Sequence, residues 1–271
     1  MPWPLSANLS MLFNQVPLLE RVEAAAQNGF DGVEIQFPYA VPAAQLRDAL
    51  QCAQMPLVLF NIPAGDLLEG GAGLAGVPSR EAGFQSALEQ ALAYAAIARP
   101  QRVNVLPGRL VEGVSRDSAL KTLATSLANA AEAFAAIDVE VVCEAINRID
   151  MPEFLLATGE DLAQMIERVA HPNLSAQLDF YHMQRMDESL PAVIDRLKGL
   201  IGHVQFADAP ERGAPGSGII DFTEAFAALE RSGYRGWIGA EYRLEPGSTD
   251  DLRWLGEWQR SGFIKQPGRS V

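Results

Sequence analysis

Short apolar runs alternate with longer segments of helical periodicity along the chain, and this alternation restricts the fold more than any other feature of the sequence. The apolar runs number eight: Leu5–Ser10, Gly32–Phe37, Leu57–Asn61, Arg102–Leu106, Val139–Glu144, Ser175–Phe180, His203–Ala207 and Trp237–Tyr242. Runs of this length, each followed by a helical pattern, are typical of strands in a parallel sheet.

The helical segments also number eight: Leu18–Asn28, Ala44–Ala53, Arg80–Ala98, Ser118–Ala136, Glu160–Val169, Leu190–Lys198, Thr223–Arg231 and Asp251–Trp258. Glycine follows the first and seventh segments, at Gly29 and Gly233, and Thr158 lies just before the fifth. These residue types favour helix ends and a helix start respectively. Strict strand–helix alternation predicts an α/β fold with a parallel sheet.

The length of the chain bears on how that sheet is arranged. A (β/α)₈ TIM barrel needs about 250 residues, and this chain has 271. A doubly wound open sheet is the alternative. Because eight units follow one another without a break in composition, we expect one closed barrel in a single domain covering 1–271.

Composition excludes several classes of protein. The formal net charge is −13 and no cluster of Lys and Arg is present, which argues against a nucleic-acid partner. No apolar run reaches the about 18–20 residues of a membrane span, and the first residues do not resemble a signal peptide. Cys52 and Cys143 do not form a disulfide framework. We therefore expect a cytoplasmic enzyme without a membrane partner; a homo-oligomer is compatible with the sequence.

A glycine-rich segment, Asp66–Val77, contains a formal match to the dinucleotide fingerprint between Gly71 and Gly76. The true fingerprint joins a strand directly to a helix. Here no strand runs into the match, and Pro78 follows at once. We interpret the segment as a loop, and we expect it to be a mobile lid over the site.

Polar residues stand at the ends of the last four apolar runs. They are Glu144, Asp179, Gln205 and Glu241, each separated from the next by about one strand–helix unit. Because the active sites of barrels lie at the carboxyl ends of the strands, these side chains are expected to converge. Three carboxylates and an amide oxygen suit Mg²⁺ or Mn²⁺ better than Zn²⁺. The alternative is that each acid caps a helix or pairs with an arginine.

Two further residues are candidates for substrate binding. His182 follows Asp179 in what the pattern indicates is a loop, and Arg212 lies in the Pro/Gly-rich loop Ala209–Gly218. Arg212 is expected to hold a substrate carboxylate, or else to be a surface arginine. His203, within a strand, is more typical of a satisfied interior histidine, and His171, in a turn, of a solvated one.

Several segments carry a family resemblance: Ala7–Phe13, Gly32–Glu34 with Phe37–Tyr39, Gln177–Asp179 with His182, His203–Gln205, and Gly236–Tyr242. Together they resemble the hydroxypyruvate isomerase and 2-oxo-tetronate isomerase family, part of the xylose isomerase-like TIM barrels. The likeness runs nearly end to end. The loop after the seventh strand departs from it, with Ala209, Gly213, Ala214 and Ile219 where polar residues are usual.

The resemblance implies a metal-dependent isomerase of small hydroxy-carbonyl acids, which passes a proton through an enediolate. It makes Glu144, Asp179, Gln205 and Glu241 the ligands of one divalent ion, and Glu144 and Glu241 also the catalytic pair. A ketose 3-epimerase is the alternative, although those enzymes usually carry histidine at the position of Gln205. An endonuclease-like DNA repair protein needs three zinc ions and many histidines, whereas this chain has 3. An inert binding barrel fits the full ligand set poorly.

Overall fold

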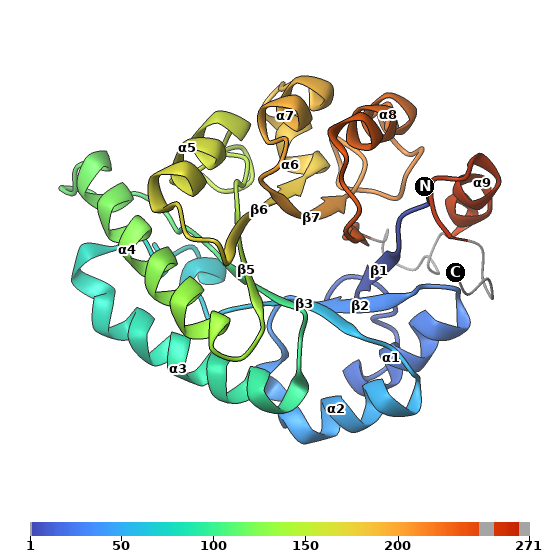
Figure 1. Ribbon diagram of the computed structural model, residues 1–271, viewed down its shortest axis with the longest axis horizontal. Coiled ribbons are helices and arrows are strands. Elements are labelled where there is room, and N and C mark those ends of the chain that lie inside the picture. The colour runs from blue at the N-terminus through green and yellow to red at the C-terminus, as the bar shows by residue number, and fades with distance from the viewer. Residues whose placement is uncertain (1, 244–251, 266–271) are drawn as a thin grey trace.

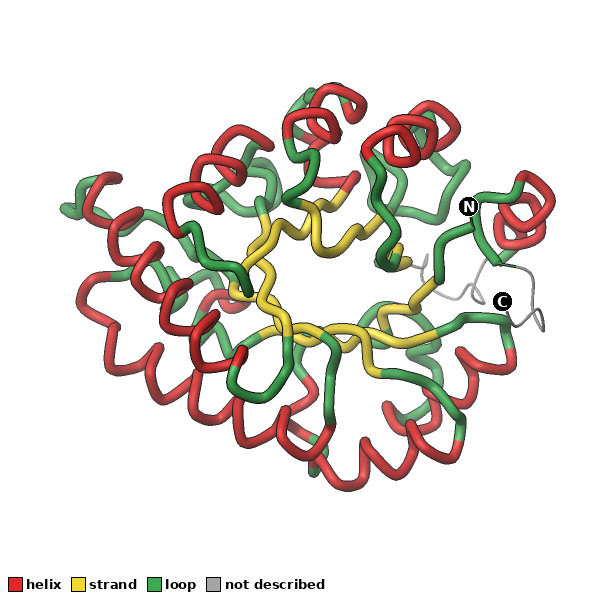
Figure 2. The backbone as a smooth tube through the Cα atoms, viewed as in Figure 1, coloured by secondary structure: helices red, strands yellow, loops and turns green. Residues whose placement is uncertain are grey.

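The computed structural model describes residues 2–243 and 252–265, and its strands close into one parallel barrel. Figure 2 shows the strands as an inner ring with the helices outside it. The strands follow one another around the barrel in sequence order: β1 (Leu5–Asn8), β2 (Gly32–Ile35), β3 (Leu57–Asn61), β4 (Arg102–Val105), β5 (Glu140–Glu144), β6 (Leu174–Asp179), β7 (Ile201–Phe206) and β8 (Ile238–Ala240). The (β/α)₈ prediction is confirmed.

Helices connect the strands and cover the outside of the barrel (Figure 1). They are α1 (Leu18–Gln27), α2 (Ala43–Cys52), α3 (Glu81–Ala98), α4 (Arg116–Ala135), α5 (Gly159–Val169), α6 (Phe180–Arg185), α7 (Leu190–Arg196), α8 (Phe222–Ser232) and α9 (Arg253–Ser261). Short 3₁₀ turns lie at Pro38–Ala40, Leu67–Glu69 and Pro78–Arg80. Within the described ranges, no helix is both long and apolar enough to cross a membrane.

Local sequence explains where the elements begin. Thr158 caps α5 by accepting a hydrogen bond from the Asp161 N–H at 3.1 Å, as its position predicts. Ser115 caps α4 in the same way, which starts that helix at Arg116 rather than at the predicted Ser118. The predicted start of the last helix, Asp251, lies outside the described residues; α9 begins at Arg253.

The sixth predicted strand and the loop after it need a correction. Phe180 is not part of the strand, and His182 is not in a loop, because the short helix α6 begins directly after Asp179. The Asp179 carboxylate caps this helix by accepting from the Tyr181 N–H at 2.8 Å. A six-residue helix is too short to show a periodicity, so only the cap could have indicated it.

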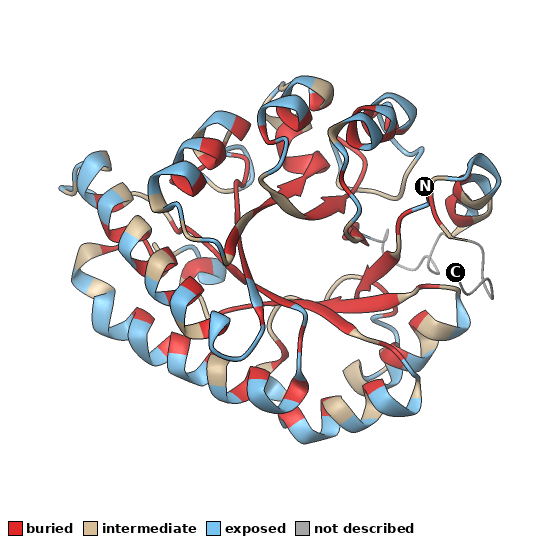
Figure 3. Cartoon of the chain, viewed as in Figure 1, coloured by how far each residue is buried: buried red, intermediate tan, exposed pale blue. Residues whose placement is uncertain are grey.

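Apolar packing lies mainly between the barrel and its helices, where inward faces are buried and outward faces exposed (Figure 3). An aromatic cluster joins the end of β7 to the helices α8 and α9: Phe206, Phe222, Phe226, Trp254 and Trp258 have neighbouring ring centroids 4.6–6.1 Å apart. Parallel register then aligns the strand ends, with Glu144 opposite Gln177 and Asp179 opposite Gln205. The predicted site residues therefore share one end of the barrel.

The barrel interior is polar. Branched apolar side chains usually fill such barrels, but buried polar and charged residues occur here on five strands: Ser6, Glu34, Arg102, Asn104, Gln177 and His203. The two cysteines are free, as expected.

Candidate active site

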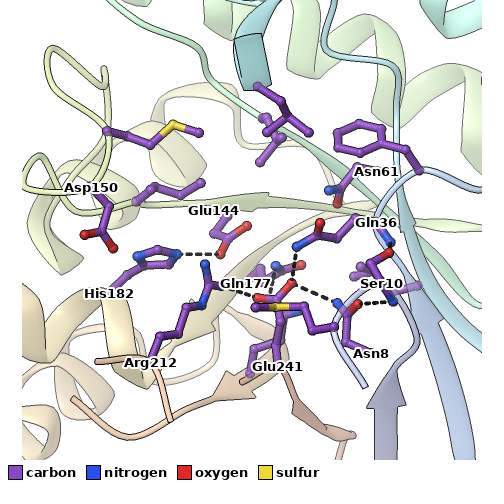
Figure 4. Close-up of a pocket in the computed structure, with 18 of the residues that line it drawn as sticks. Asn8, Ser10, Gln36, Asn61, Glu144, Asp150, Gln177, His182, Arg212 and Glu241 are labelled. Atoms are coloured by element: carbon purple, nitrogen blue, oxygen red, sulfur yellow. Dashed lines mark hydrogen bonds and ion pairs between the residues drawn. The ribbon is translucent and has the colours of Figure 1, made fainter. Parts of the chain in front are cut away.

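A pocket of about 380 Å³ opens at the carboxyl ends of the strands (Figure 4). Its volume is within the range of small-molecule sites. Strand ends contribute polar side chains, and apolar residues such as Phe37 and Leu106 line other parts of the wall. Five of the six predicted site residues line it: Glu144, His182, Gln205, Arg212 and Glu241.

Asp179, the sixth predicted residue, lies behind the pocket wall and is 1% exposed. Its Oδ2 is 3.5 Å from His182 Nε2, and Glu144 Oε1 is 3.8 Å from the same nitrogen. Glu144, Asp179 and His182 each offer one ligand atom within 4.8 Å of the others. This buried cluster could hold a metal ion.

Glu241 is held on both of its carboxylate oxygens. Asn8 Nδ2 and Gln36 Nε2 each donate to Oε1 at 2.8 Å, and Arg212 Nη2 lies 2.6 Å from Oε2. Arg212 also lies 3.5 Å from Asp179 Oδ2, and its guanidinium is stacked 5.1 Å above the ring of Tyr181. Arg212 is therefore a cation of the site, and the alternative of a surface arginine is wrong.

The three carboxyl groups are crowded in a buried place, and their pKa values reflect this. Burial raises the pKa of Glu144 well above its usual value, and the charges of Glu241 and Asp179 raise it further. Burial raises the pKa of Asp179 to about 7, although Arg212 opposes the shift. The pKa of Glu241 is raised by burial against the same arginine. A cation that accepts oxygen ligands would relieve this crowding, so the residues fit a divalent ion.

The hydrogen bonds of Asn147 define the state of His182. Asn147 Oδ1 accepts from the backbone N–H groups of Ile149 and Asp150, so its amide nitrogen faces the ring and donates to His182 Nδ1 at 2.7 Å. Burial, and then Arg212, lowers the pKa of His182 well below its usual value. A neutral ring that accepts at Nδ1 carries its proton on Nε2. His182 therefore presents an N–H to the carboxylates of the site.

Several pocket residues were absent from the sequence-based predictions. Asn8, Gln36, Asn61, Asp150 and Gln177 all line the pocket. Asn8 and Asn61 end β1 and β3, so the strand-end rule used for the last four strands would have found them. Nothing in the local sequence marks Asp150, which enters the site through the fold of the loop after β5.

His203 is an interior residue, as predicted, but only one of its ring nitrogens is satisfied. It is fully buried, its Nε2 lies 2.8 Å from Glu34 Oε1, and its Nδ1 has no hydrogen-bond partner among the described residues. His171 instead lies near Glu132, with 3.2 Å between Nε2 and Oε2. Of the chain's 3 histidines, His182 is the one that lines the pocket.

The glycine-rich loop 66–77 lies between β3 and α3, and Leu68 of this loop lines the pocket while remaining 61% exposed. Asp66 pairs with Arg80 at 2.6 Å, and Arg109 donates to two backbone carbonyls of the loop. The loop is thus placed at the mouth of the pocket and tied at its base; its mobility stays a prediction.

The family profile described as "Xylose isomerase-like TIM barrel" matches residues 22–258. The hydroxypyruvate isomerase of Escherichia coli (strain K12) is 38% identical over 250 residues, which are 92% of this chain and 97% of the relative. The 2-oxo-tetronate isomerase of Cupriavidus necator is also 38% identical, over 92% of this chain and 96% of the relative.

Solved structures agree on the fold. One described as an AP endonuclease, family 2, from Brucella melitensis has a TM-score of 0.88 at 35% identity, covering 95% of this chain and 99% of that chain. A D-psicose 3-epimerase has a TM-score of 0.80 at 17% identity, covering 96% of this chain and 99% of that one. At that identity the second likeness concerns the fold alone.

Proposed function

The chain belongs to the hydroxypyruvate isomerase and 2-oxo-tetronate isomerase family of xylose isomerase-like TIM barrels and is an isomerase, and from this we propose that it interconverts a small 2-oxo acid and its hydroxy-aldehyde or 3-oxo isomer with one divalent metal ion. The observation that carries the proposal is the grouping of three carboxylates at the carboxyl end of the barrel: Asp179 and Glu241 meet at Arg212, and Asp179 also lies in one buried cluster with Glu144 and His182.

Glu144, Asp179, Gln205 and Glu241 would hold the ion, which we propose is Mg²⁺ or Mn²⁺ because the donors are hard oxygens. The ion would act as a Lewis acid toward the substrate oxygens. His182 is better suited to donating its Nε2–H to a substrate oxygen than to binding the ion, because Asn147 occupies the lone pair of Nδ1.

Glu144 and Glu241 are the proposed proton carriers. Glu144 ends β5, Glu241 follows β8, and both line the pocket (Figure 4). One carboxylate would remove the proton from the carbon beside the carbonyl, leaving an enediolate, and the other group would return a proton to the former carbonyl carbon, while the hydroxyl proton passes from one substrate oxygen to the other.

Arg212 would hold the carboxylate of the substrate. Its guanidinium is already directed into the site, and it can form two parallel hydrogen bonds with a carboxylate. A small anion can enter a chain of net charge −13 because this arginine and the metal ion reverse the local field.

Two other activities are less well supported. A ketose 3-epimerase would use a longer, uncharged sugar and has no evident need of a buried arginine. An endonuclease with several zinc ions, suggested by the description of the Brucella structure, would need more histidines than His182 in the pocket.

The test is an isomerase assay on metal-free protein with Mg²⁺, Mn²⁺ or Zn²⁺ added back, using hydroxypyruvate, a 2-oxo-tetronate and a ketose. At saturating metal, Glu144→Gln and Glu241→Gln should lose about two to four orders of magnitude in turnover, as expected for a general acid–base group. Asp179→Asn should lose metal affinity instead and recover partly with excess metal. Near-normal turnover, with normal exchange of the carbon-bound proton into deuterated solvent, in either glutamine variant would rule out the two-glutamate mechanism.

A further inference from the structure

A carboxylate lies at the centre of the barrel, beneath the pocket, where the proposed reaction gives it no role. Glu34 comes from β2 and is fully buried. Its Oε1 accepts from Ser6 Oγ at 2.5 Å and His203 Nε2 at 2.8 Å, and its Oε2 accepts from Gln205 Nε2 at 2.8 Å. Ser6 comes from β1, and His203 and Gln205 come from β7, so the fold brings together residues far apart in the chain.

Glu34 offers only acceptors to these partners. Ser6 Oγ and His203 Nε2 both lie against its Oε1, and Gln205 Nε2 donates to its Oε2, so both oxygens face donors. A carboxylate oxygen that accepts from the amide selects the NH₂ end of Gln205.

The other end of the Gln205 amide faces the pocket side of the network. Gln205 Oε1 accepts from Gln177 Nε2 at 2.6 Å, and both glutamines line the pocket. A flipped Gln205 would place its oxygen against the Glu34 carboxylate and its NH₂ against the NH₂ of Gln177. Both contacts would be repulsive, and in a buried place the unmade hydrogen bonds would each cost about 1–3 kcal/mol.

We propose that Glu34 is a positioning residue that fixes the amide of Gln205 so that its oxygen, and not its nitrogen, is presented to the metal ion. This inference rests on the proposed function, since it takes Gln205 as a ligand. A glutamine differs from a carboxylate in that only one of its two ends can bind a cation, so a glutamine ligand requires a neighbour that selects the end.

The surrounding residues provide for this role. Gly239, which pairs with Gln205 across β7 and β8, faces the Glu34 carboxylate so closely that a Cβ at 239 would overlap it. Glycine therefore leaves room for Glu34 to reach Gln205. Gln177 contributes from the other side through its Nε2, and its own buried Oε1 has no hydrogen-bond partner among the described residues.

The test measures the binding of Mn²⁺ alone to metal-free protein, by calorimetry and by electron paramagnetic resonance of the Mn²⁺ ion. The result therefore does not depend on enzymatic turnover. Glu34→Gln should weaken Mn²⁺ binding by about 10–100-fold, as is usual when the partner that orients a ligand is lost. Glu34→Asp keeps the charge but withdraws it by one methylene, and it should weaken binding in the same direction.

A second set of variants, made in Gln205→Glu protein, distinguishes the loss of ligand orientation from the loss of the Glu34 charge. In Gln205→Glu the ligand has two equivalent oxygens and needs no orientation, so adding Glu34→Gln there should leave Mn²⁺ affinity unchanged or increase it. The charge control is Glu140→Gln, which removes a carboxylate at the opposite end of the barrel, where Glu140 pairs with Arg102 at 2.9 Å. It should change the affinity less than about threefold, since exposed charges are well screened.

The outcomes are distinct. The orienting role would be overturned if Glu34→Gln weakened Mn²⁺ binding equally in the wild-type and Gln205→Glu proteins, or if Glu34→Asp bound Mn²⁺ normally. Either result would leave the proposed metal site intact. If wild-type protein bound no Mn²⁺, the proposed function would fail and the orienting role with it. Circular dichroism and thermal melting identify any variant that does not fold, and Glu34→Asp then serves as the independent variant.

Discussion

The loop that carries Arg212 is organised by one carboxylate, and replacing it gives a prediction that needs no assumption about the metal. Asp208 follows β7 and is 1% exposed. Its Oδ1 accepts from the backbone N–H groups of Ala209 and Ile220 at 2.9 and 3.0 Å, and its Oδ2 from those of Gly216 and Gly218, both at 2.9 Å. Four backbone donors thus converge on one side chain.

Asp208→Asn preserves the size of this side chain and removes half of its acceptors. The asparagine oxygen can replace Oδ1, but its NH₂ then faces the N–H groups of Gly216 and Gly218. A hydrogen bond to a charged group contributes about 1.5–3 kcal/mol. Because both glycines are exposed and water can replace the lost acceptor, we take the lower figure, about 3 kcal/mol for two bonds. That corresponds to roughly a 150-fold increase in the opening equilibrium of the loop.

The assay is hydrogen–deuterium exchange followed by mass spectrometry on peptides covering residues 213–220. Exchange there should accelerate by about two orders of magnitude, while peptides from β5 and β6 should not change, because the loop opens locally. The KM for substrate should rise as Arg212 loses its position, with a smaller effect on turnover.

Asp221→Asn is the matched control. Asp221 caps α8 through a single hydrogen bond, 2.9 Å from the Glu224 N–H, and asparagine caps helices equally well. It should leave exchange in the loop unchanged. Unaltered exchange in Asp208→Asn, or an acceleration spread over the whole barrel, would show that Asp208 does not organise the loop.

Two further predictions concern pH and the glycine-rich loop. Asp179 has a pKa of about 7, and the pKa values of Glu144 and Glu241 are raised, so these groups must lose protons to bind a cation. The affinity for Mn²⁺ should therefore rise from pH 5.5 to 8 and then level off, and binding should release protons. Calorimetry in two buffers measures both quantities, and an affinity that does not change with pH would contradict this prediction. In metal-free protein the same three groups should favour the fold less as the pH rises from about 4 through 7, because their unfolded counterparts ionise first. The loop 66–77 should be cleaved by protease more slowly with substrate than without it, since closure would protect it, and equal rates would argue against a lid.

Local patterns were sufficient to predict the barrel and to place five of the predicted residues in one pocket. Strand and helix periodicities are properties of neighbouring residues, so the order of the elements could be read directly. The rule that strand ends converge then placed Glu144 and Glu241 in one pocket. It held because parallel register aligns the strand ends, whatever the details of the loops.

What the sequence did not predict depends on partners far apart in the chain. Arg212, in the loop after β7, pairs with Glu241, which follows β8, and Glu34 on β2 meets Gln205 on β7. The proton on His182 Nε2 follows from the orientation of Asn147, which is defined by a loop turn. None of these contacts has a periodic signature.

The polar barrel interior also affects how the strands find one another. A slip of one residue in any strand would turn its inward side chains outward. In most barrels such a slip exchanges one apolar side chain for another at moderate cost. Here it would move Glu34 or His203 into the apolar layer beneath the helices and leave the other as an unpaired buried group, an error that costs several kcal/mol. The network thereby discriminates against misregistered barrels during assembly, in a chain whose parallel strands must all be joined through long crossovers.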